Sequence, residues 1–322
     1  MMIHGYISYG TRDNLYVRGR VLENEGITLA NPHDSLFTNM KNMAKRLESD
    51  EIPGVKLRLK YGTVEVETVS DEEGYFNAEL RVQGLPENKL WHEVEITAIV
   101  APEPYLAGTK TRAEILVPPV DARFGVISDV DDTILETGAT SLFKMARNTF
   151  FLNEKTRAPL EGAADFYKLL ANNAPGETRN PFFYVSSSPW NIYDFLFQFL
   201  ALNLFPIGPI LLKDYGISKG TLFSSGHLDH KYSNIKNLLE AYPQLPFILI
   251  GDSGQKDPGI YQKVVQDFPD RISAIYIRDV KVKRRSKIIL PILEEMNRGK
   301  VPMILVENSD VATKDARQRG FI

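Results

Sequence analysis

Three aspartates at the end of an apolar run are the residues of this sequence best placed to do chemistry. Asp129, Asp131 and Asp132 follow the apolar, β-branched pair 126–127, and Thr133 comes next. Like charges this close repel one another, and a hard cation such as Mg²⁺, which prefers oxygen ligands, relieves the repulsion. At the carboxyl end of a buried parallel strand, such side chains face the crevice where open α/β sheets bind ligands. The stretch therefore predicts a metal-assisted reaction.

The same stretch allows two other interpretations. A calcium loop of the form D-x-[DN]-x-[DN]-G needs an acidic or amide residue at its fifth position and glycine at its sixth, where this sequence has Thr133 and Ile134. An acidic loop that only caps a helix meets no such conflict. Because D-x-D-x-T alone is only moderately specific, the rest of the chain has to decide between these interpretations.

Two further predicted strands end in polar residues that complement the acidic stretch. The strand Pro181–Ser186 ends at Ser186, and Ser187 follows, so hydroxyl groups and turn amides there can bind an anion. The strand Phe247–Ile250 leads into Gly-Asp-Ser-Gly, which supplies Asp252 beside glycines that let the backbone approach a ligand. Asp257 adds a second carboxylate to this loop. Lys231 lies between these two strands, at the start of a predicted helix.

Strands and helices alternate along the chain after residue 120. The strands are predicted at 124–130, 181–186, 210–212, 247–250, 272–277 and 302–306, and the helices at 141–151, 160–171, from 189, 232–242, 260–268, 291–296 and 312–319. Such alternation is typical of parallel strands joined by right-handed crossovers. The fold class expected for residues 120–322 is therefore α/β, with a doubly wound parallel sheet.

The order D-x-D-x-T, strand-terminal serine, lysine and G-D-x-x-x-x-D resembles the motif set of the haloacid dehalogenase superfamily over residues 120–322. Within it, V-S-S-S-P-W at 185–190, G-D-S-G-Q-K-D-P at 251–258 and I-Y-I-R-D at 275–279 resemble the catalytic domain of the actin-patch-type Mg²⁺-dependent phosphatidate phosphatases. The resemblance implies a haloacid dehalogenase-like Rossmannoid fold, Mg²⁺ as cofactor and hydrolysis of a phosphate monoester. Phosphatidate is the substrate that this branch implies.

The resemblance also assigns roles to individual residues. Asp129 would be the nucleophile that forms an aspartyl-phosphate. The metal ligands would be the Asp129 carboxylate, the main-chain carbonyl of Asp131 and Asp252, and the Asp131 side chain would act as general acid and base.

Five further residues would support this chemistry. Ser186, Ser187 and Lys231 would bind phosphoryl oxygens, Thr133 would brace the loop, and Asp257 would hold a metal-bound water or orient Lys231. Lys213 and Lys236 are rivals to Lys231, which is preferred because it opens the helix before the strand of Asp252. Asp132 receives no role.

Residues 1–119 are predicted to form a smaller β-sandwich, because several short alternating strands are separated by turns. The strands are expected at 5–10, 15–22, 55–61, 64–69, 75–82, 90–99 and 111–117, with a helix at 33–47, and the prolines at 118 and 119 mark the boundary. Trp91 is expected in the core, and the histidines at the surface or satisfied by neighbours. Whether this part docks a partner, forms a lid or is only structural stays open, and its partner is unknown.

Composition limits the setting in which the protein works. The chain has 322 residues, a formal net charge of −3 and no cysteine, so we expect no disulfides and no general attraction to nucleic acid. We see no signal peptide and no apolar run of the ~18 residues that a membrane span needs. A cytoplasmic protein is expected, and peripheral contact with a membrane is compatible with this.

Two segments could meet an anionic lipid surface. Residues 190–212 are rich in Phe, Leu and Ile, and basic residues run from Arg278 through Lys281, Lys283, Arg284 and Arg285 to Lys287. A buried crossover helix and a solvated loop are the preferred explanations of these two segments. A soluble sugar phosphate, a nucleotide or a phosphoprotein therefore remains an alternative substrate, and a non-enzymatic metal-bound binding protein remains an alternative function.

Overall fold

The computed structural model describes residues 1–24, 50–130, 133–134, 161–174, 177–178, 180–213, 227–280 and 286–322. The helices expected at 33–47 and 141–151 lie outside these ranges. The chain divides into two compact units, Met1–Pro119 and Val120–Ile322.

The described residues of the first unit form two sheets. β1 (Met2–Gly5), β3 (Asn14–Leu22) and β6 (Tyr75–Arg81) form an antiparallel sheet in the order β1-β3-β6. The second sheet has the order β2-β8-β7-β4-β5, with the bounds Ser8–Tyr9, Lys110–Leu116, Trp91–Val100, Lys56–Tyr61 and Val64–Val69. The single strand expected at 5–10 is thus two short strands in different sheets. A pattern of apolar residues cannot show where a chain passes from one sheet to the other.

Buried and exposed residues alternate along the strands, and the buried ones form the core of this unit. In β4, Leu57 and Leu59 are fully buried, while Lys56 and Arg58 point outward and pair with Glu67 of β5 at 2.6 and 3.1 Å. Buried side chains from both sheets join one hydrophobic cluster, which includes Leu15, Val17, Phe76, Leu80, Leu57, Leu59, Val94, Ile96 and Ile115.

The core prediction for Trp91 was wrong in detail. Trp91 is only half-buried, and the next residue, His92, is the one that faces inward and is fully buried. Consecutive residues of a strand point to opposite faces, so the register of β7 allows only one of them inside. Both ring nitrogens of His92 have hydrogen-bond partners, as expected for a histidine satisfied by its neighbours. Its Nδ1 lies 2.9 Å from the hydroxyl of Tyr61, and its Nε2 lies 3.1 Å from the carbonyl oxygen of Lys89.

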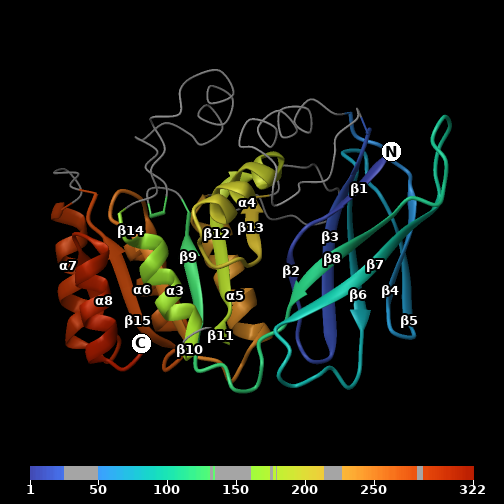
Figure 1. Ribbon diagram of the computed structural model, residues 1–322. Coiled ribbons are helices and arrows are strands. Elements are labelled where there is room, and N and C mark those ends of the chain that lie inside the picture. The colour runs from blue at the N-terminus through green and yellow to red at the C-terminus, as the bar shows by residue number, and fades with distance from the viewer. Residues whose placement is uncertain are drawn as a thin grey trace. The chain divides into compact units, whose positions relative to one another are not determined.

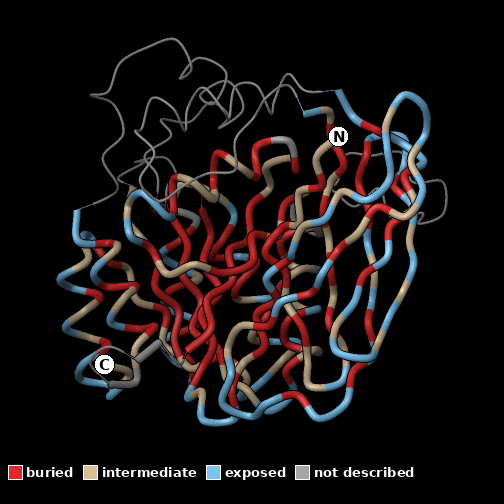
Figure 2. The backbone as a smooth tube through the Cα atoms, turned by 45° about the vertical axis from the view of Figure 1, so that its right-hand side comes forward, coloured by how far each residue is buried: buried red, intermediate tan, exposed pale blue. Residues whose placement is uncertain are grey.

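The second unit contains a six-stranded parallel sheet, which confirms the predicted α/β class. Its order is β13-β12-β9-β14-β15-β16, and every neighbouring pair is parallel (Figure 1). The strands span Ile210–Lys213, Phe182–Pro189, Gly125–Asp129, Phe247–Asp252, Ile272–Arg278 and Met303–Val306. β9 and β14 are buried at every position, as continuous apolar strands of a covered sheet are. Figure 2 shows the buried colour running along these strands and the exposed colour on the outer sides of the helices.

Helices cover both faces of this sheet. α3 (Ala163–Ala171) packs with α8 (Ser309–Gln318), and α5 (His227–Ala241), α6 (Asp257–Asp267) and α7 (Ser286–Arg298) pack in succession (Figure 1). In β14, Ile250 lines a pocket with residues of α3 and α8, while a Cβ on Gly251 would lie 2.8 Å from Tyr261 of α6. Because consecutive strand residues point to opposite faces, the two groups of helices lie on opposite sides.

Three details differ from the expected elements. α7 begins at Ser286 and contains Pro291 rather than starting there. A short antiparallel pair, β10 (Asn172–Ala174) and β11 (Glu177–Thr178), follows α3. The apolar segment after β12 forms a 3₁₀ turn (Trp190–Ile192) and α4 (Tyr193–Leu202), whose Leu196 and Leu200 are buried. This favours the crossover-helix interpretation for most of that segment. Among the described residues, no helix is both long and apolar enough to cross a bilayer.

The buried histidine makes the stability of the first unit depend on pH. A carbonyl oxygen only accepts, so Nε2 of His92 carries the proton and Nδ1 accepts from Tyr61. Burial lowers the pKa of His92 below its ordinary value of 6.5, and the hydrogen bond to Lys89 opposes this only in part. The unfolded chain therefore binds a proton more readily than the folded one.

We predict that the free energy of unfolding falls as the pH drops below about 6.5, where the unfolded histidine gains its proton first. Urea unfolding of the wild type and of His92→Asn, measured from pH 7.5 to 5.0, checks this. The asparagine removes the titrating group, so the wild type should lose more stability than the variant over this interval. The same loss in both proteins would contradict the prediction.

Candidate functional site

Three buried carboxylates meet at the carboxyl end of the parallel sheet. Asp129 is the last residue of β9, Asp252 is the last residue of the neighbouring β14, and Asp257 is the first residue of α6. Parallel strands bring their carboxyl ends to one edge, so the first two side chains come together although 123 positions separate them (252 − 129). One oxygen from each carboxylate lies within 4.8 Å of the others, and all three residues are at most 1% exposed.

The loop after β14 is folded around the carboxylate of Asp252. Its Oδ1 accepts from the backbone amides of Gly254 at 2.6 Å and Gln255 at 2.8 Å. The amide of Asp252 in turn donates to Oδ2 of Asp257 at 3.2 Å. A Cβ at Gly251 would lie 2.6 Å from the same Oδ2, so only glycine lets the strand and this carboxylate approach so closely.

Lys231 is the buried cation of this cluster. It is 3% exposed, and its Nζ lies 2.7 Å from Oδ1 of Asp129, 2.8 Å from Oδ1 of Asp257 and 3.2 Å from Oε1 of Gln255. Burial alone would lower the pKa of Lys231, but the charges of the two aspartates outweigh it and raise that pKa well above its usual value. The lysine is therefore charged at any physiological pH.

The two rival lysines lie elsewhere. Lys236 is on α5, where it is partly exposed and lies 3.7 Å from Glu240. Lys213 ends β13, with Pro189 of β12 as its register partner. Of the three, Lys231 is the one that the structure places against Asp129.

The predicted serines lie on the adjacent strand. Val185 of β12 pairs with Asp129 of β9, so Ser186 follows directly after the level of the cluster. Ser186 is fully buried, and its Oγ accepts from the amide of Ser188 at 3.0 Å, while Ser187 is partly exposed. Thr133 is buried and donates to Oδ2 of Asp129 at 3.3 Å. Asp131 and Asp132 lie outside the described residues.

Several contacts around the site were not foreseen from the sequence. Gln255, an unassigned position within the G-D-x-x-x-x-D motif, accepts from Lys231. Behind Asp129, the hydroxyl groups of Ser128 and Tyr167 lie 2.7 Å apart, both buried. Burial raises the pKa of Tyr167 above its ordinary value, so this hydroxyl stays protonated. The motif letters could have flagged Gln255, but nothing in the sequence links Ser128 to Tyr167.

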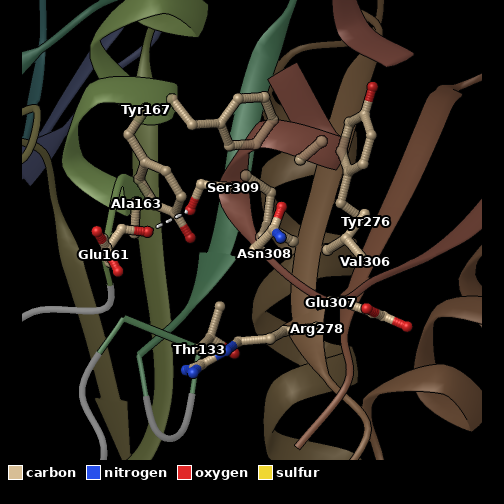
Figure 3. A pocket seen from close by; sticks show the side chains of 13 residues that line it. Thr133, Glu161, Ala163, Tyr167, Tyr276, Arg278, Val306, Glu307, Asn308 and Ser309 are labelled. Atoms are coloured by element: carbon tan, nitrogen blue, oxygen red, sulfur yellow. Dashed lines mark hydrogen bonds between the residues drawn. The ribbon is translucent and has the colours of Figure 1, made fainter. Parts of the chain in front are cut away.

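A pocket of about 240 Å³ lies beside the cluster, on the face covered by α3 and α8. Its inner wall is apolar and aromatic, and includes Phe166, Ile250 and Tyr276. Thr133 and Arg278 line it as well, and Figure 3 shows the side chain of Arg278 pointing from β15 toward Thr133. Arg278 thus belongs to the surroundings of the site, whereas the sequence grouped it with the basic run that continues to Lys287.

The carboxylate cluster has the chemistry of a site for a hard divalent cation. Its potential ligands are all oxygen atoms, which Mg²⁺ and Mn²⁺ prefer. Three carboxylates and one ammonium leave two negative charges in a buried place, and a divalent cation would balance them. The residues present therefore fit a metal ion. Asp129 and Asp252, at the ends of adjacent strands, are the residues best placed to be its ligands.

Comparisons with known proteins point to one family. Residues 124–279 match the family model described as the phosphatidate phosphatase APP1, catalytic domain. The phosphatidate phosphatase APP1 of Saccharomyces cerevisiae is 37% identical over 154 residues, and an uncharacterized protein of Schizosaccharomyces pombe is 29% identical over 168. These alignments cover 48% and 51% of this chain but only 25% and 26% of the relatives, so the chain spans about a quarter of their length.

The resemblance to the catalytic domain of the actin-patch-type phosphatidate phosphatases is thereby confirmed for residues 124–279, the segment that contains the carboxylate cluster. Among solved structures, a carbohydrate acetylesterase from Xanthomonas citri aligns over 94% of this chain and 66% of its own. Its TM-score is 0.29 at 9% identity, so this likeness supports no conclusion.

We predict that Mg²⁺ stabilises the protein through this cluster. At a hundred times its Kd, a ligand that binds only the folded state adds about 2.7 kcal/mol. Thermal unfolding with Mg²⁺ and with EDTA measures this effect. Asp252→Asn keeps the Oδ1 acceptor but removes one charge, so it should raise the melting temperature in EDTA and abolish the increment with Mg²⁺. An unchanged increment in the variant would place the metal elsewhere.

Proposed function

We propose that the second unit is a Mg²⁺-dependent phosphatase of the APP1 type, which hydrolyses a phosphate monoester through an aspartyl-phosphate on Asp129. The observation that carries the proposal is the meeting of Asp129, Lys231, Asp252 and Asp257 at one sheet edge, inside the segment that matches this catalytic domain. The strand order supports a haloacid dehalogenase-like fold, because the strand of Asp129 lies between those of Ser186 and Asp252.

The residues divide the work of phosphoryl transfer, which is mostly positioning and charge stabilisation. The carboxylate of Asp129 attacks phosphorus, and the alcohol leaves as its oxygen gains a proton. Bound Mg²⁺ would supply the charge that lets an anionic carboxylate approach an anionic phosphate. Water then hydrolyses the aspartyl-phosphate and releases inorganic phosphate. Asp131 is proposed as the acid and base of these steps.

Lys231 is proposed to bind a phosphoryl oxygen while it stays close to the nucleophile. Its contacts at 2.7 Å to Asp129 and 2.8 Å to Asp257 support this, because they hold the ammonium at the reacting carboxylate. Asp257 orients Lys231 and is fully buried, so it has little freedom to move. Ser186 and Ser187 are proposed to bind the remaining phosphoryl oxygens from the neighbouring strand, and Thr133 to fix the orientation of Asp129.

The proposed substrate is phosphatidate, the lipid named in the description of the matching family. Such a substrate would be met at a membrane surface by a protein that associates with it peripherally. The first unit, with two sheets around one core, is interpreted as a β-sandwich. A soluble phosphate ester is the other outcome that a substrate screen can return.

A phosphate-release screen tests the proposal directly. Wild-type protein with Mg²⁺ should hydrolyse an aryl phosphate, and phosphatidate in mixed micelles should be turned over faster than sugar phosphates, nucleotides or phosphopeptides. EDTA should abolish release. We predict that Asp129→Asn lowers kcat at least about a thousandfold, because an amide cannot replace the attacking carboxylate.

Asp270→Asn is the matched control, because Asp270 is an exposed aspartate with φ of 66°, a conformation that asparagine tolerates. It should retain wild-type activity. With a substrate labelled in its phosphate, acid quenching during turnover should also leave labelled phosphate bound to the wild-type protein, as an aspartyl-phosphate requires. No release from any substrate, or equal activity in Asp129→Asn, would refute the proposal. Preference for a soluble ester would overturn only the choice of substrate.

A further inference from the structure

The backbone of Arg278 lies at the end of β15, the strand next to the one that carries Asp252. It is the last residue of β15 and pairs in register with Asp252 of β14 and Val306 of β16. Its carbonyl oxygen accepts from the amide of Ser253 at 2.8 Å, and the amide of Asp279 donates to Val306 at 2.9 Å. The backbone of Arg278 is therefore bound on both sides, at the level where the sheet ends in Asp252.

The side chain of Arg278 extends toward Thr133, which lies four residues after the proposed nucleophile Asp129. Arg278 and Thr133 line the same pocket, and Figure 3 shows the guanidinium directed from β15 toward Thr133, while the carboxylate of Glu307 points the other way. Thr133 donates to Oδ2 of Asp129 at 3.3 Å. Arg278 thus points toward a residue that is itself hydrogen-bonded to Asp129.

This arrangement places a cation on each face of the sheet. Lys231 reaches Oδ1 of Asp129 from α5, while Arg278 lies on the face of α3 and α8. Burial raises the pKa of Tyr167, and the nearby charge of Arg278 opposes that shift. The hydroxyl of Tyr167 is bonded to Ser128, directly before Asp129, so the guanidinium acts within the immediate surroundings of the nucleophile.

We infer that Arg278 is a positioning residue that holds Thr133, and through it the Asp129 carboxylate, in the orientation that phosphoryl transfer requires. The inference rests on the proposed function. With Oδ1 held by Lys231 and Oδ2 by Thr133, rotation of the carboxylate is restricted from both sides. Arg278 supports the second contact. It does not touch the substrate, so its loss should affect the chemical step rather than substrate binding.

Kinetics of Arg278→Met and Arg278→Lys test this role. Methionine keeps an unbranched chain without the charge, and it should lower kcat for an aryl phosphate by about tenfold to a hundredfold, with KM within about twofold of wild type. Lysine keeps the charge without the planar fork and should give an intermediate kcat. Lys300→Met, which removes an 89% exposed cation from the same unit, should match the wild type.

Wild-type kcat in Arg278→Met would overturn the inference. A raised KM with unchanged kcat would also overturn it, because that pattern belongs to a residue that binds substrate.

A second measurement does not depend on turnover. The amide of Ile134 donates to the carbonyl of Val130 at 3.2 Å, so its hydrogen exchange reports on the loop that carries Thr133. Arg278→Met should speed exchange at Ile134 at least about tenfold, with exchange at Leu249 in the centre of the sheet unchanged. Equal acceleration at both amides, or none, would overturn the inference. If the wild type released no phosphate, the proposed function would fail, and this exchange would still decide whether Arg278 holds the loop.

Discussion

The repulsion among three buried carboxylates is the constraint on which the second unit depends. Asp129, Asp252 and Asp257 bring oxygen atoms within 4.8 Å of one another, and each residue is nearly inaccessible to water. Two unit charges 4 Å apart repel by about 4 kcal/mol at an effective dielectric constant of 20. Lys231 compensates part of this repulsion. A divalent cation would compensate the remaining negative charge and stabilise the site. A site that only maintained the fold would be more stable with fewer charges.

The parallel sheet makes this arrangement possible. Five crossovers bring the ends of six strands to one edge, so residues far apart in sequence reach the site from rigid backbone. The register pairs Val185 with Asp129 and Asp252 with Arg278, which places hydroxyl, carboxylate and guanidinium groups along the edge in a fixed order. Gly251 of β14 permits the approach of Asp257, and the backbone amides of the loop after Asp252 hold the carboxylate of Asp252. Backbone geometry thus determines which charges meet before any ligand is present.

Much of this could be predicted because strand periodicity and motif order are local properties of the sequence. All six strands of the parallel sheet were expected, and Asp129, Lys231, Asp252 and Asp257 do come together. What could not be predicted depends on packing between distant elements. The choice of Lys231 over Lys213 rested on motif order alone, since sequence does not show which lysine turns inward. The contact of Ser128 with Tyr167 and the direction of Arg278 follow from how α3 and α8 pack on the sheet. In the first unit, Trp91 was expected in the core, but the register of β7 directs His92 inward instead.

The central claim is that the cluster exists to share one cation between adjacent strand ends. Diffraction from crystals grown with Mn²⁺, recorded near the manganese absorption edge, tests it most directly. We predict one strong anomalous peak, from a Mn²⁺ ion bonded to oxygens of both Asp129 and Asp252, with Lys231 beside it. A structure at saturating Mn²⁺ with no peak between these two carboxylates, or with the ion held by other residues, would contradict the account.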